Sequence, residues 1–375
     1  MPAQSKIRIL HITNWYPTIN NPLDGIWIKK QIDSLPDRVV ADVFHLSVES
    51  RGNLKTLNST VPGIRLQIPW KSWLLIEIIT SLSLLYLLLV KVRLSRYDLI
   101  NFHIAYPLCV FLNAFRFFIK KPIIINEHWS AYHLDFGVED PKRLGRVRRI
   151  FRPDLTLITV SKALANDIAR FSGKRNLNFF VVPNVVDTNI FRFESQPTRA
   201  FFMASNWKSP KDPIVALKAF WNLRVNYPQL KLRIAGKGPL LSSMLKYVQD
   251  NDLQDHVTWL GWLNSIELAY EMQCAIGFIH LSRYETFSVV CAEAICCGTP
   301  VIASAIGGIP EFIDDSNGYL LVNNDQEGLL NAMETMLTCD KFERASIAAN
   351  AATLFNKKTV GSLYLNAIVV GCGLK

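Results

Sequence analysis

The stretch HLSRYETFSVVCAEAICCGTPVIAS, residues 280–304, decides the fold. An apolar run over Ile276–Leu281 predicts a strand, and Phe287–Cys297 predicts a helix that ends at Gly298. The apolar residues after that glycine predict a second strand. Strand, helix and strand in this order are typical of an α/β sheet whose strands run parallel.

The same alternation of short apolar runs and longer helical stretches continues along the whole chain. Runs that are apolar on both faces are typical of parallel strands covered by helices. The predicted strands are Ile7–Ile12, Val39–Phe44, Asp98–His103, Pro122–Asn126, Thr156–Val160, Phe179–Val182, Phe201–Ala204, Leu230–Ala235, Val257–Leu260, Ile276–Leu281, Pro300–Ala303 and Tyr319–Val322. They form two series, so we expect two Rossmann-like, doubly wound domains facing a central cleft.

The length of 375 residues also favours two domains. We expect a first domain over residues 1–190 and a second over 201–355. The stretch FRFESQPTRA, residues 191–200, lacks periodicity and is the expected linker. A C-terminal tail, residues 356–375, is expected to form a helix that returns across the hinge.

Composition limits the function classes. Apolar residues make up 50% of the chain and charged residues 19%, which excludes a disordered chain. The net charge of +10 favours anionic partners: nucleotide phosphates, anionic lipid head groups or nucleic acid. The basic segment PKRLGRVRRIFRP, residues 141–153, is either a solvated helix face or a patch for an anionic membrane. Nucleic acid is disfavoured because neither a recognition motif nor interleaved aromatic residues accompany the charge.

One apolar segment fits three kinds of helix. Fourteen of the eighteen residues from Trp73 to Val90 are apolar, with Glu77 inside the segment and Lys71 and Lys91 flanking it. We favour a helix packed on the first domain's sheet over an interfacial membrane helix, and a full membrane span least.

Cysteines and the N-terminus favour a cytoplasmic protein. The seven cysteines form no CxxC pair and lie mostly in apolar runs, which is typical of a reducing compartment. The first residues contain no apolar stretch of the kind found in signal peptides. We therefore expect a cytoplasmic location. This expectation includes a protein that associates with the inner face of the membrane.

The turn and helix in residues 280–304 carry candidate chemistry. Thr286 and Ser288 lie at the predicted helix start, where free backbone N–H groups suit a diphosphate. Glu293, two turns after Glu285, lies in an apolar helix and needs a polar partner, for which ribose hydroxyls are suited. From spacing alone, a structural role for both glutamates is the simpler interpretation.

The motifs around these glutamates resemble the retaining GT-B glycosyltransferases of the family-4 type. Glu285 and Glu293 stand in a Glu-x7-Glu pattern, followed by EAICCGTPVIAS and GGIPEF. Six motifs in order are a specific signal, where a lone GxG is a weak one. Further matching segments, in chain order, are NWYPTINNPLDGIWIKKQ, DLINFH, INEHWS, VVPNVVDTNIF, WKSPKDP and AGKGPL.

The resemblance implies that the second domain binds a nucleotide-sugar donor. Glu293 would bind the ribose hydroxyls, and Glu285 would contact the donor sugar. Lys211 would neutralise the leaving diphosphate. The other implied donor contacts are the backbone N–H groups of Thr286, Phe287 and Ser288, and the glycine Gly236.

The first domain would complete the site. Gly25 would let the backbone approach the diphosphate, and His128 would face the sugar as a catalytic residue beside Glu285 and Lys211. His103 and Asp24 are candidates for the acceptor or sugar side. The acceptor would be a glycan or a lipid-linked molecule.

One position departs from the family pattern. Asn206 stands where the family has an arginine, and Lys208 is the nearest compensating cation. This substitution leaves a non-catalytic nucleotide-sugar binder as an alternative, beside a GT-B epimerase or phosphorylase. No cofactor or metal is expected, because Asp250–Asn251–Asp252 follows a helix rather than a strand and His128 and His133 lack metal-binding spacing.

Overall fold

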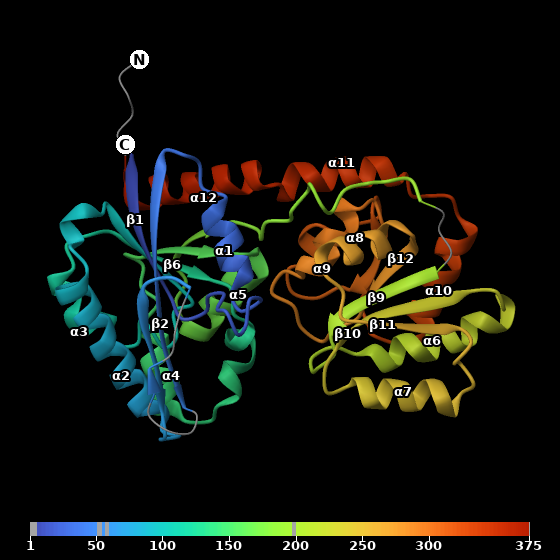
Figure 1. The fold of residues 1–375 in the computed structure, drawn as a ribbon, viewed down its shortest axis with the longest axis horizontal. Coiled ribbons are helices and arrows are strands. Elements are labelled where there is room, and N and C mark those ends of the chain that lie inside the picture. Colours follow the sequence, from blue (N-terminus) through green and yellow to red (C-terminus); the bar gives the residue numbers. More distant parts are fainter. Residues whose placement is uncertain (1–5, 51–54, 57–59, 197–199, 375) are drawn as a thin grey trace, which may run out of the picture. The chain divides into compact units, whose positions relative to one another are not determined.

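The computed structural model describes residues 6–50, 55–56, 60–196 and 200–374, in two compact units (Figure 1). The first unit comprises Met1–Val185 and Lys358–Lys375, and the second comprises Val186–Lys357. Residues 1–5 of the N-terminal segment and residues 197–199 of the expected linker lie outside the described residues. Each unit contains one sheet with helices packed against it, so the α/β, two-domain prediction is confirmed.

The first unit contains an eight-stranded sheet in the order β3-β4-β2-β1-β5-β6-β7-β8. All neighbouring strands pair in parallel except β3 and β4, which pair antiparallel. The strands are β1 Ile7–Thr13, β2 Val39–Ser50, β3 Lys55–Thr56, β4 Gly63–Ile68, β5 Leu99–His103, β6 Ile123–Glu127, β7 Thr156–Thr159 and β8 Asn178–Val181.

The helices of this unit include a segment from the C-terminus of the chain. They are α1 Ile26–Asp33, α2 Trp73–Tyr86, η1 Leu87–Lys91, η2 Leu94–Arg96, α3 Leu112–Phe115, η3 Arg116–Phe118, η4 Ser130–Gly137, α4 Pro141–Arg148, α5 Lys162–Ser172 and α12 Lys357–Cys372. Val360, Tyr364 and Ile368 of α12 are buried against Ile9 and Leu99 of the sheet. The C-terminal tail is therefore a structural part of the first unit.

The second unit contains a six-stranded parallel sheet in the order β11-β10-β9-β12-β13-β14. Its strands are β9 Ala200–Asn206, β10 Lys231–Lys237, β11 Val257–Gly261, β12 Ala275–His280, β13 Val301–Ser304 and β14 Gly318–Leu321. Its helices are α6 Pro213–Asn226, α7 Leu241–Asp250, α8 Ser265–Gln273, α9 Val289–Cys296, η5 Ile309–Glu311, α10 Gln326–Thr338 and α11 Arg344–Phe355. Asp250 ends α7, so the Asp250–Asp252 triplet lies at a helix terminus as expected.

The boundary between the units falls earlier than the expected linker. The backbone N–H of Val186 donates to the carbonyl of Phe355 in the second unit. Phe191 is buried, and the Gln273 side chain donates to the carbonyl of Arg192. These contacts attach the segment after Val185 to the second unit, because an apolar side chain and satisfied backbone groups favour packing over a free linker.

The apolar segment that begins at Trp73 forms a helix with two different faces. Ile76 and Ile79 pack against Val48 of β2, as expected for a helix on the sheet. Other apolar side chains of the same helix are exposed, including Leu82 at 61% and Val90 at 65%. By length and composition, Trp73–Lys91 is the one helix among the described residues that could cross a membrane, and 39% of its residues are buried.

Candidate active site

Three neighbouring strands of the second unit end at the same edge of its sheet. Because β9, β10 and β12 run parallel, their last residues Asn206, Lys237 and His280 lie at the carboxyl edge, where α/β folds bind ligands. Gly236 pairs with Ser205 in this register and has a φ of 110°. A Cβ atom there would lie 1.8 Å from the Ser205 carbonyl oxygen, so only glycine fits.

A buried cluster of Lys211, Glu285 and His280 lies at this edge. Lys211 Nζ forms an ion pair with Glu285 Oε1. His280 Nε2 lies 2.8 Å from the same carboxylate oxygen and 3.2 Å from Lys211 Nζ. The three side chains are 17%, 14% and 3% exposed, so the cluster is shielded from bulk water.

These contacts decide the charges in the cluster. Burial by itself would raise the pKa of Glu285, but the hydrogen bond from His280 and the charge of Lys211 lower it to about 2. Burial first, and then the charge of Lys211, lower the pKa of His280. Glu285 is therefore a carboxylate, and the neutral His280 ring donates its Nε2–H to it.

Sequence reasoning selected Glu285 and Lys211 but missed His280. The cluster joins a strand end, a turn and the loop after β9, with 69 residues separating Lys211 from His280. The available signal was a histidine next to the end of a predicted strand, five residues before Glu285. Only the parallel sheet places that position beside Lys211.

The turn after Glu285 leads directly into α9. Ser288 adopts a left-handed conformation, with φ at 71°, and precedes the first helical residue, Val289. Phe287 is buried against Phe312 and Phe355, with ring centroids 5.0 and 5.6 Å away. This packing fixes the turn, so the free N–H groups at the start of α9 have a defined direction.

The helix start corrects one prediction. The helix was expected from Phe287, with Glu293 two turns after Glu285 on a similar face, but it begins at Val289. Glu285 precedes the helix, as expected, and the helix starts two residues late because Ser288 has a left-handed backbone conformation that a helix cannot include. Glu293 is the fifth residue of α9 and is 8% exposed.

The GGIPEF segment contacts the Glu285 turn through Gly307. This glycine has a φ of 53°, and a Cβ atom there would lie 1.6 Å from the Glu285 carbonyl oxygen. The close approach connects two motifs that are more than twenty residues apart. A glycine is therefore required at this position by both backbone conformation and space.

The structure does not bring Asn206 and Lys208 into the cluster. Both side chains are exposed, and the Lys208 backbone N–H donates to the Asn206 carbonyl. In the part of the chain that the structure describes, the Lys208 side chain forms no ion pair. Lys211 is thus the cation that contacts Glu285. Thr286, half-buried, lies in the turn between Glu285 and Phe287.

Two of the first-unit candidates, Asp24 and Gly25, lie in the loop between β1 and α1. Gly25 precedes α1 with a φ of 60°, and a Cβ atom there would lie 2.4 Å from the Trp15 carbonyl oxygen. Asp24, its neighbour, lines a large cavity of this unit. Burial, and then the charge of Glu49, raise the pKa of Asp24.

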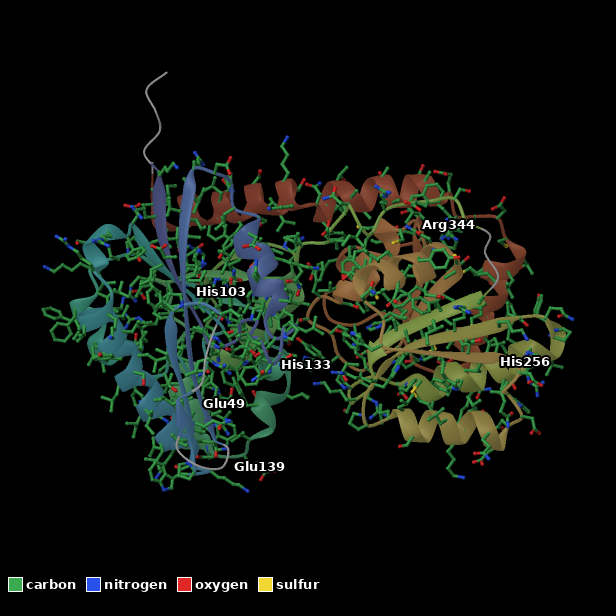
Figure 2. All side chains as sticks on the ribbon, in the orientation of Figure 1. Glu49, His103, His133, Glu139, His256 and Arg344 are labelled. Carbon is green, nitrogen blue, oxygen red and sulfur yellow. The ribbon has the colours of Figure 1, made fainter. Side chains whose placement is uncertain are left out.

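Three buried histidines form a row in the first unit. His103 ends β5, and its Nε2 lies 3.0 Å from Nδ1 of His11 in β1 (Figure 2 labels His103). His128 follows β6, with its ring centroid 6.4 Å from that of His103. Burial lowers the pKa of His128 to about 3, against a smaller opposite effect of the Asn184 side chain. The row is therefore neutral near pH 7.

Glu127, which sequence reasoning also missed, organises the loop that carries His128. Its carboxylate accepts hydrogen bonds from the backbone N–H groups of Ala105, His128 and Trp129 at 2.9, 3.0 and 3.0 Å. The Tyr132 hydroxyl donates to it at 2.7 Å. Such a fully bonded, buried carboxylate positions the backbone around His128.

The described residues contain no group of three or more His, Cys, Asp or Glu side chains placed to bind a metal ion. The second histidine considered above, His133, instead lies 3.2 Å from the carboxylate of Asp167.

Comparisons with known proteins agree with this architecture. A family model described as Glycosyltransferase Family 4 matches residues 39–190, and one described as Glycosyl transferases group 1 matches residues 187–353. N-acetyl-alpha-D-glucosaminyl L-malate synthase from Bacillus anthracis is 25% identical over 263 residues, which are 66% of this chain and 67% of that protein. Three further curated relatives, with glycogen synthase from Mycobacterium tuberculosis among them, align over 47%, 41% and 28% of their own length.

Solved structures show the same fold. The structure of Anabaena Alr3699/HepE in complex with UDP has a TM-score of 0.74 at 16% identity and covers 97% of this chain and 100% of that one. Sucrose-phosphate synthase from Thermosynechococcus elongatus has a TM-score of 0.72 at 19% identity, with the same coverage. With two adjoining family models matched in order and this fold, the chain belongs to the GT-B glycosyltransferases of the family-4 type.

Proposed function

We propose that the protein transfers a sugar from a nucleoside diphosphate sugar to a glycan or lipid-linked acceptor, with retention of anomeric configuration and without a metal. The observation that carries the proposal is the Lys211–Glu285–His280 cluster at the carboxyl edge of the second sheet, beside the start of α9. It supplies one cation, one fixed carboxylate and free backbone N–H groups.

These groups suit departure of a nucleoside diphosphate. As the bond from the anomeric carbon to the diphosphate breaks, negative charge grows on the phosphate oxygen, and Lys211 and the helix start stabilise it. Lys211 exchanges its ion pair with Glu285 for the diphosphate. Glu285, still bonded to His280, then accepts hydrogen bonds from the donor sugar.

Retention is proposed to proceed by front-face attack of the acceptor. No nucleophilic side chain for a covalent intermediate was identified in the sequence. His128 is the proposed contribution of the first unit, contacting the donor sugar as a neutral imidazole. A neutral ring hydrogen-bonds a sugar hydroxyl without repelling the positive charge that develops at the anomeric carbon.

The donor base is proposed to be uracil. The solved relatives Alr3699/HepE in complex with UDP and UDP-glucose support this choice. A cytoplasmic location is also proposed, because the seven cysteines are free.

Thermal unfolding with UDP, GDP, ADP and dTDP tests donor binding. A ligand at ~100 times its dissociation constant adds ~2.7 kcal/mol of stability, so a shift with UDP is expected. Glu293→Ala should remove most of it by removing the ribose contact, whereas Glu334→Ala, on α10, should not. An unchanged UDP shift in Glu293→Ala contradicts the ribose assignment, and no shift with any nucleotide contradicts the proposed function.

A further inference from the structure

The cluster of Lys211, Glu285 and His280 holds one positive and one negative charge in the free protein. Lys211 and Glu285 form an ion pair and are both mostly buried. The neutral ring of His280 lies 2.8 Å from the Glu285 carboxylate and 3.2 Å from the Lys211 ammonium, measured from Nε2. The buried charges therefore balance only while Lys211 stays beside Glu285.

Donor binding, as proposed above, removes this balance. When Lys211 leaves Glu285 for the diphosphate, the carboxylate remains buried beside His280 alone, and a buried charge without a partner is costly. The imidazole is the stronger base of the two groups that remain, with an ordinary pKa of 6.5 against 4.5 for the carboxyl. A proton taken up by this pair therefore resides on His280.

The groups packed around His280 provide no other place for that proton. Cys291 of α9 is near enough to the cluster for the charges of Glu285 and Lys211 to affect its pKa, but burial raises that pKa to about 12. Its thiol is therefore already protonated. On the neighbouring strand β13, Ala303 pairs with His280 and carries no charge. The charges that shift the pKa of His280 come from Lys211 and Glu285.

The direction of the change follows from these two charges. In the free protein, burial and then the charge of Lys211 lower the pKa of His280, whereas Glu285 raises it. Once Lys211 has moved to the diphosphate, one lowering effect is gone and the raising effect remains. The pKa of His280 therefore rises on donor binding, and the ring gains positive charge near neutral pH.

We propose that His280 takes up a proton when the donor binds and replaces Lys211 as the counter-ion of Glu285. The proton comes from water or buffer and adds to Nδ1, while the Nε2–H group continues to donate to the carboxylate. His280 is thus a positioning residue that keeps Glu285 charged and in place for the hydroxyl groups of the donor sugar. This inference rests on the proposed function and adds a coupled proton to its binding step.

Calorimetric titration with UDP-glucose in PIPES and in Bis-Tris, two buffers with different ionisation enthalpies, counts the protons. UDP-glucose is suitable because both of its phosphates are esterified, whereas a terminal phosphate such as that of UDP titrates with a pKa of about 6. At about pH 6.5 we expect uptake of about 0.5 proton per UDP-glucose, because an imidazole with its ordinary pKa is half protonated there. By linkage, the dissociation constant should decrease about 3-fold from pH 7 to pH 6.

Two variants test the source of the proton. His280→Gln keeps a hydrogen-bond donor for Glu285 but has no basic nitrogen, so proton uptake and the pH dependence of affinity should both disappear. Lys211→Met should also lose the uptake, because its His280 has Glu285 to itself before the donor binds. This second variant decides the question if His280→Gln does not fold, which thermal unfolding shows. The control His256→Gln, outside the cluster, should retain the uptake.

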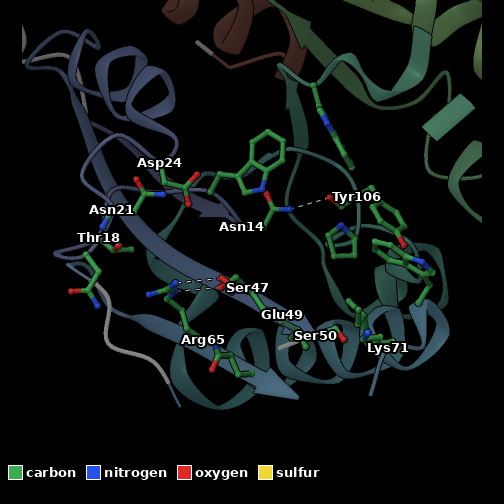
Figure 3. A pocket seen from close by; sticks show the side chains of 18 of the residues that line it. Asn14, Thr18, Asn21, Asp24, Ser47, Glu49, Ser50, Arg65, Lys71 and Tyr106 are labelled. Atoms are coloured by element: carbon green, nitrogen blue, oxygen red, sulfur yellow. Dashed lines mark hydrogen bonds and ion pairs between the residues drawn. The ribbon is translucent and has the colours of Figure 1, made fainter. Parts of the chain in front are cut away.

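A titratable group of the first unit is the alternative source of the signal. Asp24 lines a cavity of about 1190 Å³ in that unit (Figure 3), and burial and then the charge of Glu49 raise its pKa. Proton uptake that persists in His280→Gln and disappears in Asp24→Asn would assign the proton to Asp24 and overturn the proposal.

Two further results overturn the proposal and leave the proposed function unaffected. One is UDP-glucose binding without proton uptake by the wild type, and the other is uptake that persists in both His280→Gln and Lys211→Met. A protein that neither binds UDP-glucose nor shows a thermal shift with UDP contradicts the proposed function, and this inference with it.

Discussion

At the scale of single residues, His280 explains how Glu285 remains a buried carboxylate. Its Nε2 lies 2.8 Å from Glu285 Oε1, and the carboxyl has a pKa of about 2 instead of the ordinary 4.5. A carboxylate with a lowered pKa contributes stability that is fully present above the ordinary pKa and lost as the pH falls through the folded one.

Replacing His280 should therefore change acid unfolding. In His280→Leu the pKa of Glu285 rises toward its ordinary value, so less stability is lost between about pH 4.5 and 2. Stability near neutral pH should fall by about 1–3 kcal/mol, because a hydrogen bond to a charged group is removed. Urea unfolding over that pH range measures both effects.

The conservative variant His280→Gln, which keeps a donor, should recover part of the neutral-pH loss. His256→Gln, in the same unit and outside the cluster, serves as the control. If His280→Leu has the same acid dependence as the wild type, His280 does not determine the charge of Glu285.

Sequence reasoning also predicted least at the scale of single residues. It found Glu285 and Lys211 from motifs, but Glu127 and His280 also contact groups far away in the sequence, Ala105 and Lys211. Ala105 donates to Glu127 across 22 residues, for example. Only the pairing of strands brings such groups together.

At the scale of elements, the apolar runs were reliable guides. Each of the twelve predicted strands is present, although β2 continues to Ser50 instead of ending at Phe44, and β3 and β4 were missed. In β4, Gly63–Ile68, Arg65 and Gln67 alternate with apolar residues, because this strand lies near the sheet edge and is not buried on both faces. The predicted start of α9 was wrong because Ser288 has a left-handed backbone conformation, which a serine in the sequence does not indicate.

Alanine substitutions at two glycines with similar backbone conformations test the contact between the GGIPEF segment and the Glu285 turn. Gly307 and Gly261 have φ values of 53° and 68°, but a Cβ atom would clash with Glu285 at the first and meet open space at the second. Gly261→Ala should cost about 1 kcal/mol for the backbone alone. Gly307→Ala should cost clearly more and weaken UDP binding.

Urea unfolding and a UDP titration of both variants measure these effects. Equal costs at the two positions, with unchanged UDP affinity, would show that the approach of Gly307 to the Glu285 turn has no role in the site.

At the scale of the whole molecule, the chain crosses between its two units twice. The first unit is completed by the C-terminal Lys358–Lys375, and the second begins at Val186. Sequence reasoning predicted two domains from the two series of strands. It placed the boundary a few residues late, because Val186 and Arg192 contact Phe355 and Gln273, which lie far away in the sequence.

The central claim is that Lys211 binds the diphosphate of the donor, and calorimetric titrations with uridine and UDP test it most directly. The wild type should bind UDP more tightly than uridine, because the diphosphate gains the Lys211 cation and the helix start. In Lys211→Met most of that difference should disappear while uridine affinity stays the same. If Lys211→Met keeps the full preference for UDP over uridine, the cluster is not the diphosphate site and the account is wrong.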